Sequence, residues 1–214
     1  MSDEEKLLER LTAYLSNDQK HTLRIYGHGA SGKSTFARKL QLILGEERAN
    51  LLATDPYVIV GEYRDLLSSK DFPHQKVTAY LPAVHELSSL ERDIRALQSG
   101  LDILTIGTAW ASSLRLSAQK PILIVEGMSA AFLPKNLFDL SICFHTDEGT
   151  ELERRLARDT AVRGRDVHWI RQVHTSRRQQ YEHYYKMYQE EADFLISQTE
   201  EGFGIDKISN GLGK

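Results

Sequence analysis

The sequence contains a single cysteine, Cys143, among 214 residues. One thiol cannot form a disulfide within the chain, and a cysteine-based zinc site needs several. Cys143 lies in the apolar run 140–144, so we predict a buried core thiol. A strong charge of either sign is also missing: the formal net charge of −3 gives no reason to expect a nucleic-acid or membrane surface.

Long apolar segments are absent as well. The first six residues are acidic and lack the apolar core of a signal peptide, and no run is long enough to span a bilayer. We therefore expect a cytoplasmic protein. Internal repeats and low-complexity segments are missing too. The length and the 41% hydrophobic content suit one α/β domain over residues 1–214 with a small insertion.

The segment 23–36 is the most informative stretch of the chain. Residues 23–26 read as a short buried strand, 27–34 fit the pattern G-x-x-x-x-G-K-[ST], and 35–44 read as a helix. A strand, this pattern and a helix in succession indicate a loop whose backbone N–H groups surround phosphates. Lys33 is expected to reach the β- and γ-phosphates, and the Ser34 hydroxyl is expected to bind Mg²⁺. The nucleotide-binding set is Gly27, Gly29, Ala30, Ser31, Gly32, Lys33, Ser34 and Thr35. The alternative is a glycine-rich turn that binds nothing.

Four further strands are expected at 51–53, 121–127, 140–144 and 194–196, with a strand-like run at 101–106. The apolar run 121–127 is typical of a central parallel strand buried on both faces. Helices are expected at 3–16, at 86–98 and over a long span from 167 to 191. The first helix lies in an N-terminal segment of residues 1–20, and its leucine stripe packs onto the domain or binds a partner. Residues 58–86 show no period and predict loops with short helical pieces, and the tail from Ser197 reads as loop.

Two carboxylates follow predicted strands. Asp55 comes directly after the second strand and Glu126 ends the central one. The carboxyl ends of parallel strands meet at one edge, which is also the edge of the phosphate loop. Asp55 is therefore a candidate base for an acceptor hydroxyl or an indirect metal ligand, and Glu126 a candidate metal partner. The alternatives are an Asp-Pro turn at Asp55 and a solvated carboxylate at Glu126.

Arginines gather in residues 154–171 of an otherwise acidic chain. Guanidinium groups present planar donors that suit phosphate oxygens, so this stretch predicts a lid, over about residues 155–168, that closes on phosphates. The alternative is a solvated helix face that pairs arginines with acidic neighbours. The Arg-Gly-Arg sequence at 163–165 favours a hinge over a continuous helix.

These motifs together resemble the uridine kinase and phosphoribulokinase branch of P-loop kinases. The resemblance runs in order from about residue 23 to residue 196 and includes Asp55 with Tyr57, Glu126 with Gly127, and the lid pattern Arg-x-x-Arg-Asp then Arg-Gly-Arg-Asp at 155–166. It implies a three-layer α/β/α sandwich with a five-stranded parallel sheet and an Arg-rich lid, and a need for ATP and Mg²⁺. The region of about 56–120 would be the acceptor-binding insertion.

The resemblance also implies residue roles. Ser34, Asp55 and Glu126 would hold or surround the metal, and Lys33, Asp55 and Arg158 would be catalytic. Arg158, Arg163 and Arg165 would hold ATP phosphates. Asp55, Tyr57, Glu86 and Arg155 would face the acceptor.

The chain departs from uridine kinases at the acceptor. The acidic residue that grips the ribose in an aromatic-Asp-His-Pro stretch is missing from 80–86, where Glu86 is the acidic residue, and the Pro-x-Tyr-Asp hairpin that reads the pyrimidine is absent. The leading hypothesis is a kinase for a hydroxyl of a small metabolite, first a nucleoside, then another sugar-like or pantothenate-like alcohol. The second is an ATP-switched regulatory protein. Neither hypothesis involves nucleic acid or membrane, and a homo-oligomer stays open.

Overall fold

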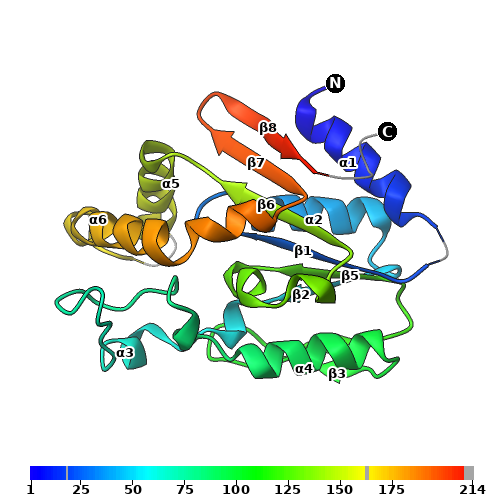
Figure 1. Ribbon diagram of the computed structural model, residues 1–214, viewed down its shortest axis with the longest axis horizontal. Helices are drawn as coiled ribbons and strands as arrows, with labels where there is room; N and C mark the ends of the chain where they lie inside the picture. The colour runs from blue at the N-terminus through cyan, green and yellow to red at the C-terminus, as the bar shows by residue number, and fades with distance from the viewer. Residues whose placement is uncertain (18, 162–163, 210–214) are drawn as a thin grey trace.

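A six-stranded sheet forms the centre of the computed structural model, which describes residues 1–17, 19–161 and 164–209. Its strand order is β2-β5-β1-β6-β7-β8 (Figure 1). The strands are β1 (His21–Gly27), β2 (Ala49–Ala53), β5 (Ile122–Glu126), β6 (Leu140–His145), β7 (Phe194–Thr199) and β8 (Gly202–Ile208). The pairs from β2 to β7 are parallel and β8 is antiparallel to β7. The predicted five-stranded parallel sheet is confirmed, and a sixth strand extends its edge.

Helices cover both faces of this sheet and make three layers. The helices are α1 (Asp3–Leu15), α2 (Lys33–Leu44), α3 (Gly61–Arg64), α4 (Leu87–Gln98), α5 (Glu148–Ala161) and α6 (Val167–Tyr184). Alternation along β5 shows the layering: Ile122 and Ile124 pack with α1 and α2, whereas Leu123 and Val125 pack with α4 and α6. Every side chain of this strand is buried, as expected for a central parallel strand.

Helix α1 packs its leucine stripe onto the domain. Leu7, Leu8, Leu11 and Leu15 are buried in the same core as α2. The helix begins with a capping box. The Ser2 hydroxyl accepts a hydrogen bond from the Glu5 N–H at 3.2 Å, and the Glu5 carboxylate accepts one from the Ser2 N–H. The stripe is therefore covered by this chain and not available to a partner.

The segment between β2 and β5 is irregular over residues 58–86, as predicted, and its helix α4 confirms the helix predicted at 86–98. It contains α3, the 3₁₀ helix Pro82–Val84, helix α4 and a two-stranded antiparallel hairpin of β3 (Ile103–Leu104) and β4 (Arg115–Leu116). Two further 3₁₀ helices, Met128–Phe132 and Lys135–Leu137, connect β5 to β6.

Two predictions at the C-terminal end were wrong. The tail from Ser197 is not a loop, because β7 continues to Thr199 and β8 follows it. The long helix predicted from 167 to 191 ends at Tyr184, and Lys186–Glu191 continues as a 3₁₀ helix. Tyr185 is fully buried, and its hydroxyl bonds the Gly27 N–H and the Met128 carbonyl, so tertiary contacts decide where the helix changes.

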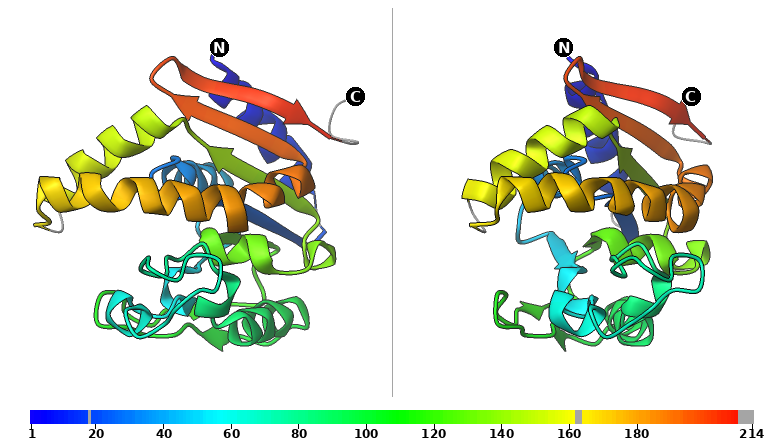
Figure 2. Two further views of the ribbon diagram at one scale, coloured as in Figure 1. Left: turned by 60° about the vertical axis from the view of Figure 1, so that its left-hand side comes forward. Right: turned by 90° about the vertical axis from the view of Figure 1, so that its left-hand side faces the viewer.

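Helices α5 and α6 form a pair that projects from the carboxyl edge of the sheet, next to the segment that contains α3 (Figure 2). Gly164, between them, has φ +59°, a left-handed conformation that suits a sharp turn after a helix. The Arg165 N–H donates to the Asp159 carbonyl at 3.0 Å and closes this turn. Within residues 1–17, 19–161 and 164–209, every helix is too short or too polar to cross a lipid bilayer.

Candidate active site

The loop 27–34 joins β1 to α2 at the carboxyl edge of the sheet. Gly27 has φ +145°, and a Cβ there would lie 2.0 Å from the Phe144 carbonyl oxygen. Gly32 has φ +90° and begins α2 without any side-chain cap. The first N–H groups of a helix have no partner within it, so these donors and the helix dipole are directed at whatever the loop encloses. The geometry suits an anion such as a phosphate group.

Lys33, Ser34 and Glu126 meet beneath this loop. The Ser34 hydroxyl donates to Glu126 Oε1 at 2.8 Å, and the Lys33 ammonium lies 3.9 Å from the same oxygen. Glu126 is almost completely buried, and burial raises the pKa of its carboxyl while Lys33 and Ser34 act against that rise. The strand end thus brings the predicted metal partner to the predicted phosphate-binding lysine.

The oxygen atoms of Ser34 and Glu126 fit a magnesium ion. The set consists of the Ser34 hydroxyl and the Glu126 carboxylate, with the charge of Asp55 close enough to act on Glu126. In the part of the chain that the structure describes, no three His, Cys, Asp or Glu side chains form a metal cluster. Mg²⁺ in phosphoryl-transfer sites commonly uses one or two protein oxygens and completes its shell with phosphates and water. The donor set is therefore the kind that a Mg²⁺–nucleotide complex needs.

Asp55 lies at the carboxyl end of β2 beside that of β5. The Thr54 N–H donates to the Glu126 carbonyl at 2.7 Å, so the two strand ends are joined just before Asp55. The Asp55 side chain is exposed, and its charge acts on both Glu126 and His85. The charge of Arg64 acts on His85 as well.

His85 supports the turn at Asp55, a role that sequence reasoning missed. Its Nε2 donates to the Ala79 carbonyl at 2.8 Å, and its Nδ1 lies 2.7 Å from the Ser129 hydroxyl. The Ser129 hydroxyl also lies 3.4 Å from the Thr54 carbonyl oxygen, and its single proton is donated to His85 Nδ1 or to this oxygen, not to both. Burial lowers the pKa of His85 to about 4, so the ring is neutral at physiological pH.

Two residues assigned to the acceptor are placed elsewhere. Tyr57 is fully buried and donates its hydroxyl to Asp93 of α4 at 2.6 Å, because the 3₁₀ turn Asp55–Tyr57 rotates it into the core. The prediction that Tyr57 faces the acceptor is therefore wrong, because its side chain is part of the core. Glu86 directly precedes α4 without a side-chain cap hydrogen bond, is exposed, and is not among the residues that line the large cavity, so its contact with the acceptor stays a prediction.

Helices α5 and α6 hold the phosphate loop through a buried polar group. His28 of the loop donates from Nδ1 to the Gly29 carbonyl and accepts from the Thr146 N–H at Nε2, both at 2.9 Å. Glu151 of α5 lies 3.7 Å from His28 and accepts from Arg178 of α6 at 3.0 Å. The Arg154 guanidinium also donates to the Ala30 carbonyl at 3.2 Å. The loop is thus tied to both helices.

The predicted lid arginines divide between two environments. Arg155 is buried on the face of α5 that carries Glu151 and Asp159, whereas the partly exposed Arg158 donates to Asp159 at 2.9 Å. The guanidinium of Arg165 lies 4.8 Å from the Trp169 ring centre. Arg163 lies outside the described residues.

A cavity of about 870 Å³ opens between the α3 segment, the tip of the β3–β4 hairpin and helices α5 and α6. Arg155 and Arg165 line it together with Arg64 and Arg177. Arg177 also reaches the phosphate loop, since its Nη2 would lie 3.9 Å from a Cβ on Gly29. Sequence reasoning missed Arg64 and Arg177, because each lies outside any recognised motif and only the fold brings them together.

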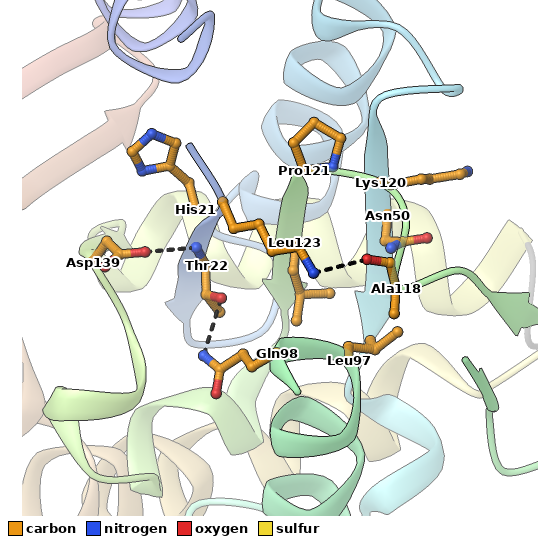
Figure 3. Close-up of a pocket in the computed structure, with 11 residues that line it drawn as sticks. His21, Thr22, Asn50, Leu97, Gln98, Ala118, Lys120, Pro121, Leu123 and Asp139 are labelled. Carbon is orange, nitrogen blue, oxygen red and sulfur yellow. Dashed lines mark hydrogen bonds between the residues drawn. The ribbon is translucent and has the colours of Figure 1, made fainter. Parts of the chain in front are cut away.

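A second cavity, of about 220 Å³, lies at the opposite, amino-terminal end of the strands. In Figure 3 the Thr22 N–H donates to Asp139 at 2.8 Å and Gln98 donates to the Thr22 hydroxyl at 3.1 Å. Lys20 donates to the Ala118 carbonyl at 3.1 Å. These polar groups satisfy one another, and none is a predicted catalytic residue.

Comparisons with known proteins show the fold and the family of this chain. The uridine-cytidine kinase B of Dictyostelium discoideum is 26% identical over 155 residues, which are 68% of this chain and 61% of that protein. The chain therefore spans less than two thirds of the length of this relative. Two solved structures share the fold. D-glycerate 3-kinase from Cryptococcus neoformans has a TM-score of 0.64 and 12% identity, and the match covers 96% of this chain and 99% of that chain. Phosphoribulokinase from Rhodobacter spheroides has a TM-score of 0.62 and 15% identity, and the match covers 84% of this chain and 71% of that chain.

The family model described as phosphoribulokinase / uridine kinase family matches residues 23–202. That range begins in β1, includes the phosphate loop, Asp55, Glu126 and helices α5 and α6, and ends at the first residue of β8. The chain belongs to the phosphoribulokinase / uridine kinase family.

Proposed function

We propose that this protein transfers the γ-phosphoryl group of ATP to a hydroxyl of a small metabolite. The observation that carries the proposal is the meeting of Lys33 and Ser34 with Glu126 beneath an anion-binding loop, next to a cavity large enough for a metabolite. Family membership supports the reaction class.

The residues divide the work as follows. The backbone of the loop 27–34 and Lys33 bind the β- and γ-phosphates, and Ser34 and Glu126 hold Mg²⁺, which neutralises phosphate charge when it is bound. Asp55 accepts the proton of the acceptor hydroxyl, and Arg158 and Arg165 stabilise the phosphates from the lid side. Catalysis comes from placing the attacking hydroxyl oxygen in line with the leaving oxygen of ATP and from neutralising the phosphate charge, without a covalent enzyme intermediate.

The acceptor classes are a nucleoside and another sugar-like or pantothenate-like alcohol. The nucleoside is supported by the name of the curated relative, a uridine-cytidine kinase. The second class is supported by the lining of the cavity, which includes four arginines, and by the absence of the sequence motif that reads a pyrimidine.

The test is a transfer assay with radiolabelled ATP, Mg²⁺ and a panel of hydroxyl-bearing metabolites. We expect label to move to at least one small acceptor and the Lys33→Ala variant to lose that transfer. Binding of ATP with slow hydrolysis, and no transfer to any acceptor, would instead support the nucleotide-switch hypothesis and would overturn the kinase proposal.

A further inference from the structure

The cavity wall holds more positive than negative charge. Five basic residues line it: Arg64, Lys76, Arg155, Arg165 and Arg177. Three acidic residues, Glu62, Asp65 and Asp166, line it as well. Lys76 pairs with Asp65, and Asp166 caps α6 by accepting from the Trp169 N–H at 2.8 Å, so two of the three acidic groups are already engaged.

Three of the arginines carry buried donors without a hydrogen-bond partner. Within the described residues these donors are Nε of Arg64, Nε of Arg177, and Nε and Nη1 of Arg155. Among the described residues, the ionic contacts of Arg155 are long, 3.5 Å to Glu151 and 4.0 Å to Asp159, although its side chain is 3% exposed. Buried donors are normally satisfied, so unmet donors on one wall point to a ligand that supplies the acceptors.

The guanidinium group of Arg177 repels those of both Arg64 and Arg155. Burial, and then the charge of Arg177, lowers the pKa of Arg64. The same two causes, in the same order, lower the pKa of Arg155 to about 10. Cations gathered in a partly desolvated pocket are costly unless an anion lies among them.

We propose that the phosphate acceptor carries an oxyanion group, a phosphate or a carboxylate, in addition to its hydroxyl, and that Arg64, Arg155 and Arg177 hold this group. The inference rests on the proposed function and narrows its substrate class. Guanidinium forks bind phosphate or carboxylate oxygens with paired, charge-assisted hydrogen bonds. A neutral nucleoside supplies no counter-charge for the three arginines.

The position of Arg177 fits an acceptor and not a remote anion site. Its guanidinium adjoins Gly29 of the phosphate loop and also lines the cavity. An anionic group held by Arg64, Arg155 and Arg177 would keep the acceptor beside the loop that holds the transferring phosphate. The rings of Trp110 and Trp169 line the same cavity and offer apolar faces to the carbon skeleton.

Matched pairs of alcohols test the charge requirement. The full chain is saturated with Mg²⁺ and a non-hydrolysable ATP analogue, so that the phosphate loop is filled, and is then titrated calorimetrically with ribose 5-phosphate against ribose, and with pantothenate against pantothenol. Transfer from labelled ATP to the same four probes and to uridine is measured in parallel. We expect binding and transfer only with an anionic member, and the phosphorylated and carboxylated arms identify which oxyanion is used.

Three variants locate the group. Arg64→Gln and Arg177→Gln should each weaken binding of the accepted anion by about 10- to 100-fold, the size of one charge-assisted hydrogen bond. Arg171→Gln removes the same charge from an exposed position of α6 outside the cavity and should change nothing. Melting temperature and affinity for the ATP analogue check that each variant folds and keeps its nucleotide site.

The outcomes separate this inference from the proposed function. Transfer to uridine or ribose with no preference for the charged probes would overturn the anionic acceptor and leave the kinase intact. A loss of ATP affinity in Arg64→Gln and Arg177→Gln, with acceptor affinity unchanged, would overturn it as well, because the arginines would then serve the nucleotide. Absence of transfer to every probe, together with no binding of any probe by the loaded protein, would count against both.

Discussion

At the scale of single residues, Asp55 is the proposed base that accepts the proton of the acceptor hydroxyl. It is exposed at the end of β2, and its charge reaches Glu126 beneath the phosphate loop. Asp55→Asn keeps the shape of the side chain but cannot take a proton, so we expect transfer to fall by about 10² to 10⁴-fold while ATP binding stays largely intact. Turnover with the accepted alcohol and calorimetric binding of ATP measure the two effects.

Lys33→Ala is the comparison for that variant. In the parent protein the charge of the Lys33 side chain acts on the transferring phosphate, so its removal should lower both turnover and nucleotide affinity. Equal turnover in Asp55→Asn and the parent protein would remove Asp55 from the mechanism.

His28 and His85 predict how stability depends on pH. Burial lowers the pKa of both to about 4, below the value of about 6.5 in an unfolded chain. The unfolded state therefore binds protons first as pH falls. The contribution of these two rings to the free energy of unfolding is fully present above about pH 6.5. It decreases toward pH 4 by up to about 1.4 kcal/mol per pH unit for each histidine.

Urea unfolding at pH 7, 6 and 5 measures this slope. Between pH 6.5 and 5 the double variant His28→Gln/His85→Gln should show a shallower slope than the parent, whereas His168→Gln, at an exposed position of α6, should not change it. Identical slopes in the parent and the double variant would show that these two rings titrate normally in the folded protein.

At the scale of elements, the α5–α6 pair depends on one buried carboxylate. Glu151 has no exposed surface and contacts His28, Arg155 and Arg178, whereas Glu182, the other partner of Arg178, is largely exposed. Glu151→Gln leaves buried positive charge uncompensated, so we expect a loss of about 3 kcal/mol in the free energy of unfolding. Glu182→Gln breaks a surface contact of the same arginine and should cost no more than about 0.5 kcal/mol. Equal costs in urea unfolding would mean that burial does not strengthen this pair.

Apolar runs predicted the strands of the sheet because the central strands are buried on both faces. The edge strand β8 has mostly exposed or half-buried residues, and its pairing with β7 defines it, so no local pattern identified it. The phosphate loop, Lys33, Ser34 and Glu126 were predictable because a motif and a strand end place them. Tyr57, Arg64 and Arg177 were not, since a single 3₁₀ turn and long-range packing decide which way these side chains point.

At the scale of the whole molecule, distant segments converge on one cavity. The chain contains two tryptophans, and both line it: Trp110 from the β3–β4 hairpin and Trp169 from α6. Tryptophan emission, excited selectively over that of the nine tyrosines, is therefore a direct probe of this cavity. Helix α6 also carries Arg177, which adjoins the phosphate loop, so the two halves of the proposed site share one element.

We expect the accepted alcohol to shift the tryptophan emission of the nucleotide-loaded protein, because it displaces water from both rings. The ATP analogue alone, bound at the phosphate loop, should produce a smaller change. Trp110→Phe and Trp169→Phe should each retain part of the acceptor signal, and the double variant should lose it while still transferring phosphate. A full emission change with nucleotide alone and none on adding the alcohol would place the acceptor outside the cavity, and the three arginines would then need another ligand.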